Sequence, residues 1–387
     1  MEKEATSAAM RTVIIAEAKK LLRQNRRTVA GYTFTIPSLY EYRHQWLWDS
    51  CFHAIVLRHF DIKAAEKELL SLMASQKKSG MVPHESKYSL FGFQLPYTSR
   101  ITQPPFIARA VLDVYKKSRD KAFIAGIFSQ LQLYHKWLEL KREHNNVLKV
   151  VDSNESGEDN SVLWDDEYIL PIHLTYMRWL TTYVPLYPQL AVIKSVKATA
   201  IYADALDCMS QLADILRNKE LSRYYKNRNK AVVAAMTKTF RYEDGLYYSL
   251  THSGKPILYK TNSTFAPMFA GAISKKEATE LVENHLLNQK EFWIDFPIPT
   301  VAADEKKFNP KGYWRGPMWI NINWLVHRGL LRYGFKDVAE LLLQKTIAAI
   351  KKSGFREYYN PLTGDGLGAK DFGWSTLVVD MIKSGNE

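Results

Sequence analysis

The residues best suited to chemistry in this chain of 387 residues are carboxylates that stand among Gly, Asn and Ser in short polar stretches. One stretch, DSNESGEDNS at 152–161, holds four carboxylates around a single glycine. Such a stretch can bind calcium, form a solvated acidic patch or place one carboxylate for acid catalysis. A calcium loop of the EF-hand type needs a bidentate Glu at its position 12, and that position is Leu163. The calcium interpretation is therefore excluded, and the other two depend on the rest of the chain.

Two carboxylates differ from the rest in their neighbours. Asp159 follows a glycine-containing turn, and Asn160 and Ser161 beside it can orient its carboxyl group. Glu357 follows a helical pattern that should end near Gly354. On spacing alone, a capping or turn carboxylate is the commoner explanation for either residue. The full set of candidates in such stretches is Glu41, Asp49, Glu85, Glu155, Glu158, Asp159, Asp165, Asp166, Glu357, Asp365 and Asp371.

Aromatic residues surround these carboxylates. They make up 13% of the chain and gather in YEYRHQWLW, GYWRGPMW, LYY and EYYNP, next to Gly, Pro, Asn or Asp. Aromatics of a core would follow helical or strand periodicity instead. Aromatic faces in loops stack against sugar rings or bases, and amide and carboxyl groups pair with hydroxyls. This combination suits a carbohydrate substrate, and cleavage of a glycosidic bond needs two carboxyl groups, one protonated and one ionised.

Several other classes of function fit the sequence poorly. The net charge of +13 invites a nucleic-acid partner, but Lys and Arg stand at helix ends and on polar helix faces, so a solvated basic surface is predicted. There is no H-E-x-x-H or Cys/His cluster, so neither a metal nor a cofactor is predicted. Cys51 and Cys208 lie in apolar helical contexts and read as small buried hydrophobes.

The start of the chain is charged and helical, with no secretory pattern, and no apolar run approaches 18 residues. A soluble, cytoplasmic protein without a membrane partner is therefore expected.

The dominant pattern along the chain is helical. Apolar residues recur at spacings of 3 and 4, and helices are predicted near 4–25, 48–60, 62–76, 103–118, 120–144, 198–216, 218–239, 264–273, 275–288, 317–332, 335–353 and 373–384, with another within 170–186. A weak strand signal lies at 245–250. The helices fall into pairs in which the first member is apolar and the second amphipathic, which is typical of an inner and an outer helix.

Six such pairs predict an (α/α)6 barrel formed by one domain, residues 1–387. The polar aromatic stretches precede the inner helices, so they should converge on one end of the barrel. Helix N-termini also present free N–H groups there, suited to hydroxyls and anions.

Four ordered motifs resemble glycoside hydrolase family 63: WLWDS (46–50), ESGEDNS (155–161), YWRGPMWIN (313–321) and GFREYYNPLTGDGLG (354–368). RITQPP (100–105) and GMVPH (80–84) are similar to further segments of this family. The chain looks most like its small prokaryotic members, the mannosylglycerate and glucosylglycerate hydrolases, and the resemblance runs from about Tyr42 to Trp374. One departure is Asn154, which stands where relatives usually carry a Trp.

The resemblance implies an (α/α)6 barrel that hydrolyses an α-glucoside or α-mannoside with inversion and without a metal. It implies that Asp159 is the general acid and Glu357 the general base, with their carboxyl groups about 6.5–9.5 Å apart. The substrate-binding residues that it implies are Tyr42, Trp46, Trp48, Asp49, Gln103, Tyr313, Trp314 and Trp319. Arg315, in the YWRGP segment, is also predicted for the site, where it can orient a carboxylate or support the loop. The supporting residues are Glu155, Asn160, Ser161 and Tyr359.

Three other functions compete with this one. Within the same reaction class, the main alternative is a trehalase-like or oligosaccharide-trimming α-glucosidase. A sugar-binding barrel without hydrolysis would have lost one of the two carboxyl groups, and both are present. A nucleic-acid-binding helical protein would use the basic surface and would give Glu357 no role.

Overall fold

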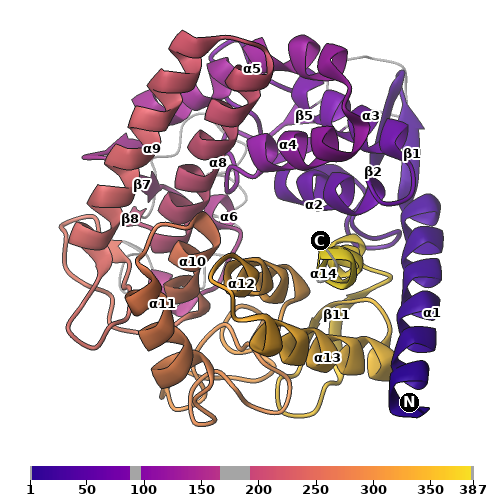
Figure 1. Ribbon diagram of the computed structural model, residues 1–387, viewed down its shortest axis with the longest axis vertical. Helices are drawn as coiled ribbons and strands as arrows, with labels where there is room; N and C mark the ends of the chain where they lie inside the picture. The colour runs from indigo at the N-terminus through magenta and orange to yellow at the C-terminus, as the bar shows by residue number, and fades with distance from the viewer. Residues whose placement is uncertain (1, 88–96, 166–191, 385–387) are drawn as a thin grey trace.

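Two concentric rings of helices form the body of the molecule (Figure 1). The computed structural model describes residues 2–87, 97–165 and 192–384. The inner ring consists of α2 (Leu47–Leu57), α4 (Ile107–Ser118), α8 (Val196–Ile215), α10 (Ala266–Ala270), α12 (Ile320–Arg332) and α14 (Val378–Ser384). The outer ring consists of α1 (Glu2–Asn25), α3 (Ile62–Ala74), α5 (Lys121–Lys141), α9 (Lys219–Phe240), α11 (Lys275–Leu281) and α13 (Lys336–Ser353). The predicted (α/α)6 barrel is confirmed.

The two rings differ in how much of each helix is buried. Every residue of α2 is buried, as expected of a helix that has neighbours on all sides. Helix α13 buries one stripe at spacings of three and four, from Ala339 to Ile350, and leaves its charged residues outside. Neighbouring inner helices contact one another around the ring, and α14 closes it against both α12 and α2.

Polar side chains cap the N-termini of several outer helices, at the points where the chain turns from an inner helix to an outer one. The side chains of Asp61, Asp120 and Asn218 accept hydrogen bonds from the first turns of α3, α5 and α9. Ser274 and Glu277 form a reciprocal capping box at the start of α11. The predicted helix boundaries lie close to the observed ones, except that α4 begins four residues later, at Ile107, because the segment up to Pro105 is not helical. The predicted helix within 170–186 and Asp166 lie outside the described residues.

Small antiparallel sheets occupy the connections that lead into the inner helices. The longest pairing order is β6 (Glu143–His144), β7 (Val147–Val150), β8 (Ile193–Lys194) and β9 (Leu250–Thr251). The strand predicted at 245–250 is therefore only partly right, since β9 includes just its last residue. The other sheets pair β1 (Arg26–Val29) with β2 (Tyr32–Thr35), β10 (Arg356–Tyr359) with β11 (Gly366–Lys370), and β4 (Glu85–Lys87) with both β3 (Gln45–Trp46) and β5 (Tyr97–Thr98).

Short helical turns complete these connections. They are α6 (Ser153–Ser156), η1 (Val162–Trp164), η2 (Asn262–Phe265) and η4 (Gly373–Leu377), while a π-helical turn, η3 (Val282–Leu286), extends α11. Most of these turns and sheets lie in the segments that lead into the inner helices, and we call the end of the barrel at which these segments gather the mouth.

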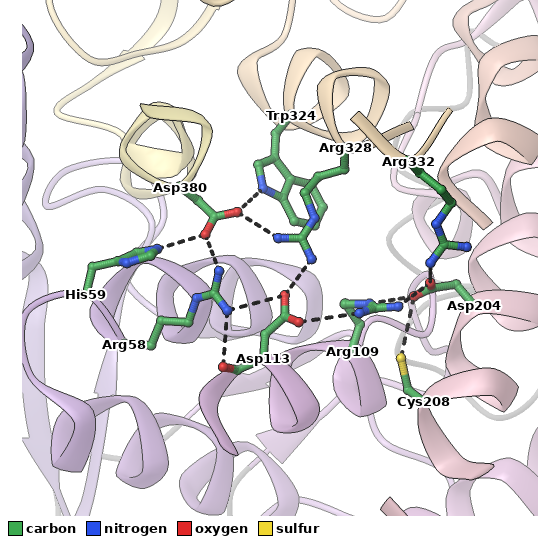
Figure 2. Close-up of polar contacts among 10 residues, drawn as sticks. All are labelled: Arg58, His59, Arg109, Asp113, Asp204, Cys208, Trp324, Arg328, Arg332 and Asp380. Atoms are coloured by element: carbon green, nitrogen blue, oxygen red, sulfur yellow. Dashed lines mark hydrogen bonds and ion pairs between the residues drawn. The ribbon is translucent and has the colours of Figure 1, made fainter. Parts of the chain in front are cut away.

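The barrel axis is filled rather than hollow. Below the mouth, Phe52, Phe106, Phe269 and Trp324 form a cluster whose ring centroids lie 5.1–6.0 Å apart where they touch. Farther along the same helices, charged groups meet in what we call the basal network (Figure 2). It consists of Arg58, His59, Arg109, Asp113, Asp204, Cys208, Trp324, Arg328, Arg332 and Asp380. The barrel is therefore closed by apolar and then ionic packing at the end opposite the mouth.

No helix among the described residues is both long enough and apolar enough to cross a membrane.

Candidate active site

A cavity of about 410 Å³ lies at the mouth of the barrel. Its walls come from the segments that lead into α2, α4, α8, α12 and α14, as the sequence predicts, whereas the stretch before α10 contributes none of the described lining residues. The lining residues are Pro37, Tyr42, Trp46, Trp48, Asp49, His84, Gln103, Asn154, Gly157, Asp159, Asn160, Tyr313, Trp314, Glu357, Phe372 and Trp374. The cavity has the size and the mixed aromatic and polar lining that are usual for small-molecule sites.

Glu357 is held in one orientation by three donors. It lies on β10 and is 4% exposed. Its Oε1 accepts hydrogen bonds from the hydroxyls of Tyr42 at 2.9 Å and Tyr313 at 3.2 Å. Its Oε2 accepts one from the backbone N–H of Ala369 at 2.9 Å. Burial raises the pKa of the Glu357 carboxyl above its ordinary value, while these three hydrogen bonds favour the ionised form and oppose the rise.

Asp159 stands on a tight turn between α6 and η1. The turn needs Gly157, whose φ is +71°, and a Cβ there would lie 2.5 Å from the Trp48 ring. Asn160 ties the turn to the loop before α12, because its Oδ1 accepts from the Trp314 N–H at 2.9 Å and its Nδ2 donates to the Gly312 carbonyl at 3.1 Å. The backbone around Asp159 is therefore fixed from both sides.

Tyr313 lies within the electrostatic reach of both candidate carboxylates. Burial raises the pKa of Tyr313 well above its ordinary value, and the charges of Asp159 and then Glu357 raise it further. Tyr42 shows the same influences, with burial first and Glu357 ahead of Asp159. The two tyrosines thus stay protonated and can donate hydrogen bonds at neutral pH.

Four indole rings form the apolar part of the cavity wall. Trp48 packs edge-on against Trp374, with centroids 5.5 Å apart at 90°. Trp314 is supported from behind by Trp319, which stacks on it at 3.6 Å and 8°. The fourth ring, Trp46, packs edge-on against His84 at 5.1 Å. Rings held in this way offer flat faces to a ligand without losing side-chain freedom on binding.

Two buried polar atoms of the cavity lining have no hydrogen-bond partner within the described part of the chain. They are Asp49 Oδ1 and Trp46 Nε1. Burial raises the pKa of Asp49 well above its ordinary value, which favours a neutral carboxyl group that can donate. Unsatisfied buried polar groups are rare in native proteins and call for an explanation such as a bound ligand or water.

Gln103 and His84 line the cavity but are occupied by structural hydrogen bonds. Gln103 Oε1 accepts from the Trp48 N–H at 3.1 Å, which fixes the start of α2. His84 Nδ1 lies 2.6 Å from Ser99 Oγ. Burial lowers the pKa of His84 to about 3, so the ring is neutral at physiological pH.

Most of the residues predicted for the site line the cavity. These are Asp159, Glu357, Tyr42, Trp46, Trp48, Asp49, Gln103, Tyr313, Trp314 and Asn160. Two residues predicted as substrate contacts do not line it. Trp319 is 0% exposed and forms the layer behind Trp314, where its Nε1 donates to the Tyr313 carbonyl at 3.1 Å. Arg315 turns away from the cavity and holds Asp165 through two hydrogen bonds of 2.7 Å.

The remaining predicted supports act at a distance from the cavity. Glu155 is bound by Arg142 through hydrogen bonds of 2.6 and 2.9 Å, so it anchors α6. Ser161 caps η1. Tyr359 is 0% exposed, and its hydroxyl donates to the Gly354 carbonyl at 2.7 Å.

Sequence reasoning missed several lining residues. Phe372 and Trp374 stand immediately before and within η4, so their place ahead of an inner helix was a usable signal. Pro37 lies in the segment after β2 and carries no such signal.

No group of three or more His, Cys, Asp or Glu among the described residues is arranged to hold a metal ion.

Comparison with known proteins shows the family of the chain. The chain matches the model of the mannosylglycerate hydrolase MGH1-like glycoside hydrolase domain over residues 42–375. It is 31% identical to a mannosylglycerate hydrolase of Thermus thermophilus, over 94% of this chain and 99% of that protein. It is 26% identical to a glucosylglycerate hydrolase of Mycolicibacterium hassiacum, over 95% of this chain and 97% of that protein.

A solved structure gives the same answer for the fold. The crystal structure of a family 63 mannosylglycerate hydrolase from Thermus thermophilus in complex with glucose superposes with a TM-score of 0.84 at 31% identity, over 96% of this chain and 100% of that one. The chain therefore belongs to the MGH1-like glycoside hydrolases of family 63, and it is a glycosidase that acts on a small glycoside.

Proposed function

We propose that the protein hydrolyses an α-linked glucosyl or mannosyl glycerate with inversion, with Asp159 as the general acid and Glu357 as the general base. The observation that carries this proposal is that both carboxyl groups line one cavity and that two tyrosine hydroxyls orient Glu357 in it. The relatives that are mannosylglycerate and glucosylglycerate hydrolases support the choice of substrate.

In this mechanism the carboxyl group of Asp159 protonates the glycosidic oxygen as the bond to the anomeric carbon breaks. Glu357 accepts a proton from a water on the opposite face of the ring, and the resulting hydroxide forms the new bond. The hydrogen bonds from Tyr42 and Tyr313 favour the ionised form of Glu357, as a base requires. Asp49 and Trp46 supply the unpartnered atoms that a sugar hydroxyl can satisfy.

The recognition of a glycerate carboxylate needs its own test. None of the described residues that line the cavity is Lys or Arg. Lys260, a cation that charge alone would suggest, is paired with Glu291 and Asp304. Among the described lining residues, neutral hydrogen-bond donors are thus the groups that would bind the glycerate carboxylate. The substrate panel should therefore pair each glycosylglycerate with the glycosylglycerol that lacks this carboxylate.

The test is hydrolysis of glucosylglycerate, mannosylglycerate, both glycosylglycerols, trehalose, nigerose and kojibiose, with the anomer of the released sugar followed by NMR. We expect a glycosylglycerate to be cleaved fastest and the β-anomer to appear first. First appearance of the α-anomer would exclude inversion, and faster cleavage of trehalose or kojibiose would exclude the proposed substrate.

The two catalytic assignments are tested by substitution. Asp159→Asn and Glu357→Gln should each lower kcat by about 10²–10⁴-fold, the usual contribution of general acid or base catalysis. Asp365→Asn is a matched control, because Asp365 lies near Glu357 in sequence but is exposed and paired with Lys352. Full activity of either active-site variant would rule out its assigned role.

A further inference from the structure

A buried lysine stands directly behind the cavity wall. Lys197 lies in the first turn of α8 and is 3% exposed. Its Nζ approaches Glu158 Oε1 to 2.6 Å, and Glu158 is also 3% exposed. Asn262 Nδ2 donates to the same carboxylate oxygen at 3.0 Å. None of these three residues lines the cavity.

Stability does not explain this cation. Taking an ion pair out of water costs free energy, and replacing a buried pair with apolar side chains is often neutral or stabilising. The first turn of a helix is also the end at which the macrodipole disfavours a positive charge. Burial lowers the pKa of Lys197, against the opposing influence of the Glu158 and Asp159 charges. Features that break local rules in this way are most often found at functional sites.

The charge of Lys197 faces the cavity through two of its walls. Its Nζ lies 5.8 Å from the Trp48 ring centroid and 5.5 Å from that of Trp314, and both rings line the cavity. Its partner Glu158 immediately precedes Asp159 on the same turn. The pair thus sits between the fixed core of α8 and the turn that carries the proposed acid.

We propose that Lys197 and Glu158 form a charge pair that positions Asp159 and balances the charge around it during glycoside hydrolysis. This inference rests on the proposed function. The two residues do not touch the substrate, and they act through Asp159 and the indole wall. The described titratable or charged groups around Asp159 include Glu158 on its own turn, Lys197 on α8, Tyr313 and Arg315 before α12, Tyr42 before α2, Asp49 on α2 and Glu357 on β10.

Removing the charge of Lys197 and removing the charge of Glu158 should have opposite effects on the pH dependence of kcat/KM. Lys197→Met leaves the Glu158 carboxylate uncompensated beside Asp159, which then holds its proton to a higher pH. Glu158→Gln leaves the Lys197 ammonium uncompensated, and Asp159 then loses its proton at a lower pH. Since the acid acts in its protonated form, the alkaline limb of kcat/KM should move up by about one pH unit in the first variant and down by a similar amount in the second.

The experiment measures kcat/KM against pH and the thermal midpoint for the parent, Lys197→Met, Glu158→Gln, the double variant and Lys197→Arg. We expect the alkaline limb of kcat/KM to shift in opposite directions in the two single variants. In the double variant this limb should return toward its position in the parent, and in Lys197→Arg it should lie close to that position. Each single variant should lower the thermal midpoint, because the remaining charge stays buried without its partner, and the double variant should recover it. Assayed well below its own midpoint, Lys197→Met should still show a kcat lowered by up to about tenfold at neutral pH, since a weaker acid protonates the leaving group more slowly.

Two kinds of failure are distinguishable. If the single variants lose activity only in proportion to a lowered thermal midpoint, with the alkaline limb unmoved, the pair is structural and the inference is wrong. The double variant keeps the inference testable if one single variant fails to fold, because it removes both buried charges together. If the parent cleaves no glycoside of the panel, or if Asp159→Asn is fully active, the proposed function itself fails, whatever the behaviour of Lys197.

Discussion

Asp380 is the residue of the basal network whose loss should cost most. It is 0% exposed and accepts hydrogen bonds from Arg58 Nη2 at 2.6 Å, Trp324 Nε1 at 2.8 Å and Arg328 Nη1 at 3.1 Å, with His59 Nε2 also at 2.8 Å. These partners come from the C-terminal end of α2 and from α12, so one carboxylate on α14 connects three inner helices (Figure 2).

Asp380→Asn keeps the shape of the side chain but removes its charge and turns an amide N–H toward donors. Removing one partner of a buried ion pair typically costs about 3–5 kcal/mol, because the other charge stays buried without compensation. We expect a loss of that size in the free energy of unfolding, measured by equilibrium urea denaturation. The usual total for a folded domain is about 5–15 kcal/mol, so the change is large. At urea concentrations well below its unfolding midpoint, the variant should keep the kcat of the parent, because the basal network lies at the end of the barrel opposite the cavity.

The dependence of the free energy of unfolding on acidic pH provides a second test. Burial acts to raise the pKa of Asp380, but Arg58, the His59 hydrogen bond and Arg328 outweigh it and hold the pKa well below its ordinary value. A carboxylate of this kind contributes stability above its unfolded pKa, and that contribution disappears as the pH falls below about 4. The free energies of unfolding of the parent and of Asp380→Asn should therefore become more similar as the pH is lowered.

Asp214→Asn is the matched control, because Asp214 forms an exposed pair with Lys219 and its loss should leave the urea midpoint almost unchanged. A loss of less than about 1 kcal/mol in Asp380→Asn at neutral pH, or a difference that widens in acid, would refute the reasoning.

Two further substitutions probe the cavity. Tyr42→Phe removes one of the hydrogen bonds that favour ionised Glu357, so the acidic limb of kcat/KM should move to higher pH, and an unmoved limb would contradict the role of the hydroxyl. Gly157→Ala places a Cβ against the Trp48 ring at a positive φ and should lower both the thermal midpoint, by the equivalent of about 1–3 kcal/mol, and kcat/KM. Gly245→Ala is its control, since Gly245 has a similar φ of +82° but a Cβ added there would meet no atom within 4 Å. This variant should keep the kcat/KM of the parent.

The sequence predicted the helices well because the pattern of their burial is local. An inner helix such as α2 is apolar on every face, and an outer helix such as α13 has one apolar stripe, so three or four turns are enough to tell them apart. The strands were mostly missed because each is short and depends on a distant partner. Strand β7, for example, pairs with β8 more than forty residues later in the sequence, and no local pattern indicates that pairing.

Most of the cavity lining could also be predicted, since every stretch that precedes an inner helix must arrive at the mouth. The direction of each side chain could not. Trp314 and Trp319 stand in one motif, yet one lines the cavity and the other supports it from behind. Lys197 escaped notice because it opens a helix of ordinary composition, and only the fold brings it to Glu158 and Asn262.

The closed base of the barrel has a consequence for turnover. Because the aromatic cluster and the basal network fill the axis, the described part of the chain leaves the mouth as the route by which a ligand enters and leaves the cavity. On the proposed mechanism, we expect the sugar ring that contains the anomeric carbon to lie deepest in the cavity and the leaving group to face the solvent. The leaving group would then depart first, and the released sugar would follow along the same route. We therefore expect a glycosidic bond in the interior of a longer chain to be cleaved poorly, and the released sugar to compete with the next substrate molecule for the cavity.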